Sequence, residues 1–101
     1  MRSLPVVLRA AAERDIRRAH AHYEGRREGL GADFLRQVDA ALETVAGNPE
    51  LCQVVEQKRQ IRRALTRRFP YALYYLTEPE RVVVLAVLPA SMNPTRWHTR
   101  R

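Results

Sequence analysis

The chain has 101 residues, enough for one compact domain and too few for two, because domains shorter than about 50 residues rarely hold a core unaided. Apolar residues make up 46% and charged residues 29%, a globular composition that excludes a chain disordered throughout. The longest apolar run, Val82 to Leu88, is far shorter than the roughly 20 residues of a membrane-spanning helix. We therefore expect one domain over residues 1–101, no membrane segment and a cytoplasmic location.

The net charge of +7 is distributed unevenly along the chain. Residues 1–56 carry 8 basic and 9 acidic side chains, whereas residues 57–101 carry 10 basic and 2 acidic ones. An arginine-rich solvated surface would explain the preference for arginine over lysine, but it would not explain this asymmetry. The cationic C-terminal half attracts either phosphate backbones or an acidic protein partner, and composition leaves both open.

The N-terminal half predicts a strand and two helices. Val6 to Leu8 form a short apolar run typical of a brief strand. Apolar residues then recur at helical spacing from Ala12 to Tyr23, and the glycine-containing stretch from Gly25 to Gly31 predicts a loop. A second helix has its apolar face between Phe34 and Val45 and ends at Gly47, Asn48 and Pro49. Two helices joined by a short loop should pack as an antiparallel hairpin.

The C-terminal half predicts three strands, at Ile61–Phe69, Tyr71–Leu76 and Val82–Leu88. Leu51 to Val55 form an extended lead-in, and Thr77 to Arg81 form a turn. The last strand is apolar on both faces and should be central in the sheet. The fold class is therefore α+β: strand, helix, helix and three strands, with the helix hairpin packed on one face of a small, largely antiparallel sheet.

Arginines on both sides of the first predicted C-terminal strand are the main candidates for ligand binding. The planar guanidinium group binds phosphate or carboxylate through two hydrogen bonds, although charges on an edge strand also prevent aggregation. The candidates on this strand are Arg62, Arg63, Arg67 and Arg68. The neighbouring tyrosines, Tyr71, Tyr74 and Tyr75, are more typical of packing than of base stacking.

The C-terminal tail adds a second group of candidates. Arg96 and Arg100 extend the cationic surface, and Trp97 is expected to anchor the tail. His98 could act as a general acid or base near neutral pH. The sequence has no glycine-rich phosphate loop and no histidine pair at metal-binding spacing, so we expect neither a metal nor a cofactor.

Several residue strings, taken in this order, resemble the RelE/ParE superfamily of toxins from bacterial type II toxin-antitoxin modules, and in particular its ParE-like branch. The strings are Tyr23-Glu24, Gly29 to Phe34, Asn48-Pro49, Arg68 to Tyr75, Val82 to Leu88, and Asn93 to Trp97. The resemblance implies a small α+β fold, growth inhibition, and a cognate antitoxin protein that neutralises the toxin.

The resemblance also implies two possible mechanisms. RelE-like members cut ribosome-bound mRNA, and Arg63, Arg67 and His98 would be the candidate catalytic groups in that case. However, Ala72 occupies a position where an arginine is expected, and the region near Met92 lacks the usual basic group. ParE-like members instead bind DNA gyrase, which requires a surface and no catalytic residues.

A ParE-like gyrase inhibitor, more a binding toxin than an enzyme, is therefore the leading interpretation. An mRNA interferase that acts on the ribosome and mRNA, or a decayed non-toxic family member, is the alternative. The candidate surface for target or antitoxin comprises Arg62, Arg63, Arg67, Arg68, Arg96, Trp97 and Arg100.

Overall fold

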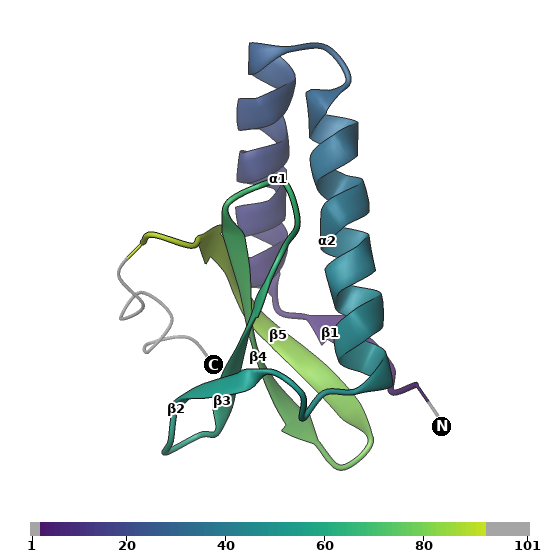
Figure 1. Cartoon of the computed structure of the whole chain (residues 1–101), viewed down its shortest axis with the longest axis vertical. Coiled ribbons are helices and arrows are strands. Elements are labelled where there is room, and N and C mark those ends of the chain that lie inside the picture. The colour runs from purple at the N-terminus through teal and green to yellow at the C-terminus, as the bar shows by residue number, and fades with distance from the viewer. Residues whose placement is uncertain (1–2, 93–101) are drawn as a thin grey trace.

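The computed structural model describes residues 3–92 (Figure 1). A short strand, β1 (Val6–Leu8), leads into two helices, α1 (Ala10–Arg26) and α2 (Leu30–Gly47). Four strands follow the helices: β2 (Gln53–Glu56), β3 (Ile61–Leu65), β4 (Tyr71–Glu78) and β5 (Arg81–Pro89). Within residues 3–92, no helix has the length and apolarity needed to cross a membrane.

The strands form one mixed sheet in the order β1-β5-β4-β3-β2. β1 pairs with β5 in parallel, and the other three pairings are antiparallel. This arrangement confirms the predicted α+β class, and β5 lies inside the sheet between β1 and β4, with Val82 to Leu88 all buried. Residues 51–55, predicted only as an extended lead-in, overlap with β2, so the C-terminal half has four strands instead of three. In β2, Val54 pairs with Arg62 of β3.

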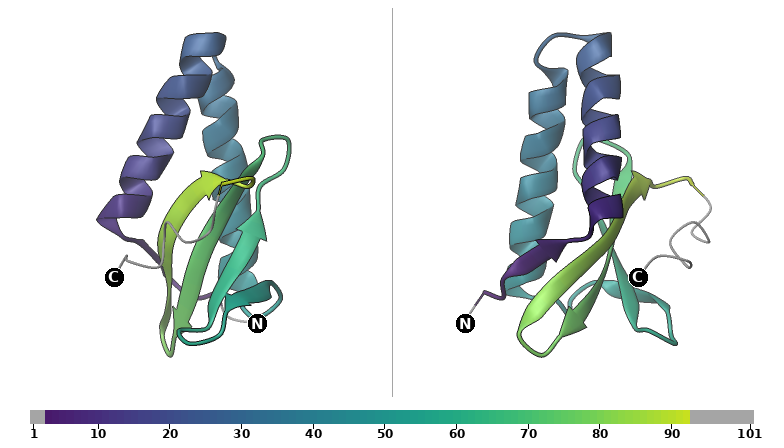
Figure 2. Two further views of the ribbon diagram at one scale, coloured as in Figure 1. Left: turned by 90° about the vertical axis from the view of Figure 1, so that its left-hand side faces the viewer. Right: turned by 180° about the vertical axis from the view of Figure 1, so that it is seen from behind.

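The helix hairpin covers one face of the twisted sheet (Figure 2). The predicted apolar stripe of α2 faces the sheet: Phe34, Val38 and Val45 are buried in the same core as the strand residues. Phe34 also belongs to an aromatic cluster whose ring centroids lie 4.8–6.0 Å apart. The other members of the cluster are Tyr23, Phe69 and Tyr71. Burial of a phenylalanine of this kind contributes about 1.5–3 kcal/mol.

The loop predicted from Gly25 to Gly31 is shorter in the structure, where only residues 27–29 separate the two helices. Glu24 explains the difference, because its carboxylate accepts hydrogen bonds from the backbone N–H groups of Gly29 (3.0 Å) and Gly31 (2.9 Å). It thereby satisfies donors at the start of α2 that would otherwise lack partners. Gly29 makes the turn at φ 87°, a backbone conformation that favours glycine.

Two strand boundaries also differ from the prediction. β3 ends at Leu65, so the residues predicted to continue it to Phe69 form a loop instead. In this loop Arg68 has φ 69°, and the Thr66 hydroxyl donates a hydrogen bond to the Phe69 carbonyl at 2.7 Å. This loop conformation places the Phe69 ring in the core. The alternation of residue types in the sequence predicted a continuous strand here and could not predict the loop. β4 extends to Glu78, so the predicted turn at residues 77–81 is shorter.

Candidate functional site

Arg62 holds the connection between α2 and β2. Its Nη1 donates hydrogen bonds to the carbonyl oxygens of Glu50 (2.9 Å) and Cys52 (2.6 Å). Both bonds involve a charged donor and are therefore stronger than bonds between neutral groups. Arg62 was predicted to bind a ligand, but in the structure its guanidinium group is bonded to the backbone of the same chain.

Arg63 points to the opposite face of β3. Its Nε donates to the Tyr74 hydroxyl at 3.2 Å, and its Nη2 donates to the Ala90 carbonyl at 2.9 Å. Tyr74 belongs to a second buried cluster on the sheet face away from the helices, together with Ile61 and Leu85. Arg63 thus joins β3, β4 and the segment after β5.

The other two predicted arginines lie in the loop between β3 and β4. Arg68 places Nη2 4.0 Å from the Asp33 carboxylate and lies over the Phe69 ring at 5.5 Å from its centroid. Arg67 is exposed, and its guanidinium group has neither a hydrogen bond nor an ion pair with any residue between 3 and 92. Arg67 is therefore available to an external anion on the described surface.

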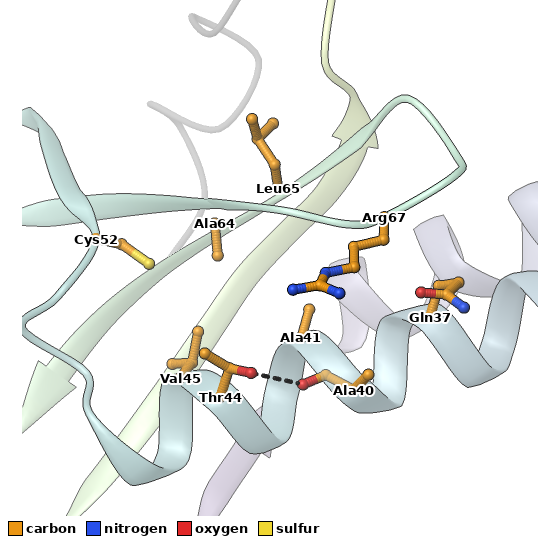
Figure 3. Close-up of a pocket in the computed structure, with 9 residues that line it drawn as sticks. All are labelled: Gln37, Ala40, Ala41, Thr44, Val45, Cys52, Ala64, Leu65 and Arg67. Atoms are coloured by element: carbon orange, nitrogen blue, oxygen red, sulfur yellow. Dashed lines mark hydrogen bonds between the residues drawn. The ribbon is translucent and has the colours of Figure 1, made fainter.

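Arg67 lies at one wall of a groove between α2 and β3 (Figure 3). The groove has a volume of about 440 Å³, and most of its lining side chains are small. Figure 3 shows Arg67 extending from the β3–β4 loop toward α2. The lining residues are Gln37, Ala40, Ala41, Thr44, Val45, Cys52, Ala64, Leu65 and Arg67. This α2–β3 groove combines small apolar side chains, the polar side chains of Gln37 and Thr44, and one unpaired cation.

Three exposed apolar side chains come from the stretch of chain between residues 51 and 65. Among residues 3–92 the large hydrophobic side chains that remain exposed are Leu51 (70%), Leu65 (59%) and Val55 (37%). Leu65 is one of the residues at the groove, but its side chain points to the side of β3 away from α2 (Figure 3), and Leu51 precedes the groove residue Cys52.

The strand tyrosines confirm the packing interpretation. Tyr74 and Tyr75 are almost completely buried, and the Tyr75 hydroxyl donates to the Pro49 carbonyl at 2.6 Å. Burial raises the pKa of Tyr75, and it also raises the pKa of the partly buried Tyr71. Neither of the two buried rings has a free face on which a base could stack.

The candidates for RNA cleavage do not converge in the described structure. Arg63 and Arg67 lie on opposite sides of the sheet, and Arg63 has intramolecular partners. His98, Arg96, Trp97 and Arg100 lie outside the described residues. Within residues 3–92 no group of three or more His, Cys, Asp or Glu side chains could hold a metal ion.

Sequence reasoning missed the groove itself. Its α2 wall consists of Gln37, Ala40, Ala41, Thr44 and Val45, residue types that are common in helices. The available signal was that small side chains recur on one side of a strongly amphipathic helix, beside its buried stripe. Small side chains on α2 allow another helix or strand to approach closely. Only the three-dimensional structure shows that β3 leaves this side of α2 partly uncovered.

Comparison with known proteins identifies the family. The family model described as "ParE toxin of type II toxin-antitoxin system, parDE" matches residues 6–94. The chain belongs to this family. The resemblance to the ParE-like branch is thus confirmed, and the chain is a ParE toxin of a toxin-antitoxin system. No curated protein matches the chain.

A solved structure described as "Chromosomal ParDE TA system from P. aeruginosa" has the same fold as this ParE-family chain. The TM-score is 0.75, and the match covers 86% of this chain and 96% of the other. The sequences are only 11% identical, so the match supports the fold and does not transfer individual residues.

Proposed function

We propose that this ParE-family toxin inhibits growth in the cytoplasm by binding DNA gyrase, and that a cognate antitoxin neutralises it by binding the same small domain. Family membership supports the toxin role, and the solved ParDE relative supports an antitoxin partner. Gyrase is the target that the resemblance to the ParE-like branch implies. A binding mechanism requires a complementary surface and no proton transfer.

The separation of Arg63 from Arg67 favours binding over RNA cleavage. Cleavage at a ribose 2′-hydroxyl requires a base, an acid and cations that act together at one phosphate. Arg67 lines the groove facing α2, whereas Arg63 bonds to Tyr74 and Ala90 on the other side of the sheet. The different neighbours of the two cations support a binding role over a shared catalytic centre.

Expression in a test bacterium distinguishes the mechanisms. After induction of the toxin, plasmid topology is examined on gels that separate topoisomers, and mRNA ends are mapped in the same cells. Gyrase inhibition predicts relaxed or broken plasmid with intact mRNA before growth stops. Codon-dependent mRNA cuts with normally supercoiled plasmid would refute the proposal, and growth without arrest despite folded toxin would indicate a non-toxic family member.

A further inference from the structure

We propose that residues 93–101 pack on the sheet face opposite the helices, with the Trp97 ring against Arg63 and Leu65. The segment lies outside the described residues, and the inference assigns it as the cover of an apolar face that residues 3–92 cover only in part. The inference goes beyond the proposed function and does not depend on the target of the toxin.

The sheet face opposite the helices, called the distal face below, is apolar and buried. Both helices lie on the other side of the sheet (Figure 2). Nevertheless Ile61, Tyr74 and Leu85, which form one cluster on the distal face, are each no more than 2% exposed. A sheet face that borders water leaves its side chains partly exposed, so burial of this degree requires further side chains above the strands.

The chain that follows β5 begins to cover this face. Ala90 and Met92 are partly buried against the same cluster as Tyr74. The Ala90 carbonyl also accepts a hydrogen bond from Arg63 Nη2 at 2.9 Å. The chain therefore enters the segment 93–101 beside the cluster that the segment would cover.

Trp97 is close enough in sequence to reach β3. It is five residues beyond Met92, and an extended chain of that length spans up to about 17 Å. Neighbouring strands lie only about 4.8 Å apart, so the segment can cross from the end of β5 over β4 to β3.

Leu65 in β3 gives Trp97 an apolar contact. Leu65 pairs with Ala72, a member of the distal cluster, and its side chain points away from α2 (Figure 3). It is 59% exposed, in contrast to the cluster beside it. Coverage of Leu65 by an aromatic ring would remove apolar area of both side chains from water, which stabilises the docked segment.

Arg63 gives Trp97 a second contact on the same face. Its guanidinium group is held by hydrogen bonds to the Tyr74 hydroxyl (3.2 Å) and the Ala90 carbonyl. A planar cation held in this way attracts the face of an indole ring, the most favourable aromatic partner for a cation. The segment 93–101 contains no acidic residue, so it can offer Arg63 this aromatic contact but no side-chain ion pair.

The docked segment divides the cationic surface that the sequence predicted as one. Arg67 lines the groove on the helix side of the sheet. Arg96 and Arg100 would accompany Trp97 onto the distal face. A partner seated in the groove would then leave these two arginines accessible to a second, anionic partner.

The fluorescence of Trp97 tests the docking in the full chain without a label, because this is the single tryptophan. Docking predicts that the folded toxin emits at a shorter wavelength than the urea-unfolded toxin and that acrylamide quenches it several-fold less efficiently, since the ring is shielded from water. Emission and quenching equal to those of the unfolded chain would overturn the proposal.

Two matched variants test the position of the ring. Leu65→Asp and Leu51→Asp place the same charge at exposed leucines, the first on the distal face and the second in the turn after α2. Leu65→Asp should shift the emission of Trp97 to longer wavelength and raise quenching several-fold, whereas Leu51→Asp should match the wild type. Circular dichroism verifies that both variants are folded. Identical fluorescence of the two variants would refute the contact with Leu65.

Unfolding provides a readout that does not depend on fluorescence. Trp97→Ala should lower the urea midpoint followed by circular dichroism, because it removes the ring that covers the distal face. Arg101→Ala, four residues further along, should leave the midpoint unchanged. A midpoint of Trp97→Ala equal to that of the wild type would show that the ring is not packed and would overturn the proposal.

Discussion

The carboxylate of Asp15 in α1 accepts a buried hydrogen bond from the backbone N–H of Val87 in β5, at 2.9 Å across 72 residues of sequence. β1 pairs with β5 only from Val82 to Val84, so Val87 lies beyond the end of that edge strand. Asp15 supplies an acceptor where the sheet has no further strand. The bond fixes α1 over the sheet next to a bulge in the β4–β5 pairing.

Removal of this acceptor should destabilise the fold. Asp15→Ala leaves the Val87 N–H buried without the acceptor, which costs about 1–3 kcal/mol of unfolding free energy. Asp15→Asn keeps an oxygen acceptor and should lose less. Urea unfolding measures both, with Asp39→Ala on the exposed side of α2 as the control, expected to change stability by less than about 0.5 kcal/mol. Equal stability of Asp15→Ala and the control would contradict this role.

Two glycines in the helices should respond in opposite directions to alanine. A Cβ at Gly25 would meet no atom within 4 Å, so Gly25→Ala should stabilise α1 by about 0.5–1 kcal/mol. A Cβ at Gly31 would lie 2.7 Å from the His20 ring and 2.9 Å from the Glu24 carboxylate. Gly31→Ala should therefore destabilise the hairpin by about 1 kcal/mol or more. Thermal unfolding of both variants tests the contrast, and similar gains in melting temperature would disprove it.

Glu24 makes the helix hairpin sensitive to acid. Hydrogen bonds from the backbone N–H of Gly29 and then Gly31 lower the pKa of Glu24 below its usual 4.5. Because the folded-state pKa is the lower one, the stabilisation is present above the unfolded-state pKa and is lost as the pH falls through the folded-state pKa. Glu24→Gln should be less stable than wild type near neutral pH, and the difference should narrow in acid. A difference independent of pH would exclude the charge as its cause.

Substitution of Arg62 should destabilise the fold, whereas substitution of Arg67 should not. Arg62→Ala removes two charge-assisted hydrogen bonds to the 50–52 connection and should lower the unfolding free energy by about 1.5 kcal/mol. Arg67→Ala should change it by less than about 0.5 kcal/mol, because no described residue pairs with that side chain. Denaturant titration of the two variants measures the difference. A larger loss for Arg67→Ala would contradict the assignment of Arg67 to an external partner.

Periodicity predicted the helices and the central strand well. The apolar face of residues 34–45 recurs at helical spacing, and the short run of residues 82–88 is rich in β-branched valine and bounded by turn signals. Phe34, Val38 and Val45 of the first and all residues of the second are buried. The boundaries that failed depend on contacts between distant side chains and backbone. The Glu24 carboxylate accepts hydrogen bonds from the backbone N–H groups of Gly29 and Gly31, which shortens the loop between the helices. The Thr66 hydroxyl donates a hydrogen bond to the Phe69 carbonyl just after the end of β3.

The candidate site was predicted less completely, since residue type alone does not show which arginine is already bonded. Arg62, Arg63, Arg67 and Arg68 are equivalent in the sequence, yet three of them have partners within the fold. The groove beside Arg67 is built largely from alanines and other small side chains that no functional motif marks. Only the placement of α2 against β3 brings these residues together.

Inhibition of purified gyrase tests the central claim most directly. Relaxed plasmid, gyrase and ATP are incubated with increasing amounts of the toxin, and a translating extract with labelled mRNA receives the same preparation. We predict loss of supercoiling or accumulation of broken plasmid, with intact mRNA. Normal supercoiling together with site-specific mRNA cuts would contradict the account.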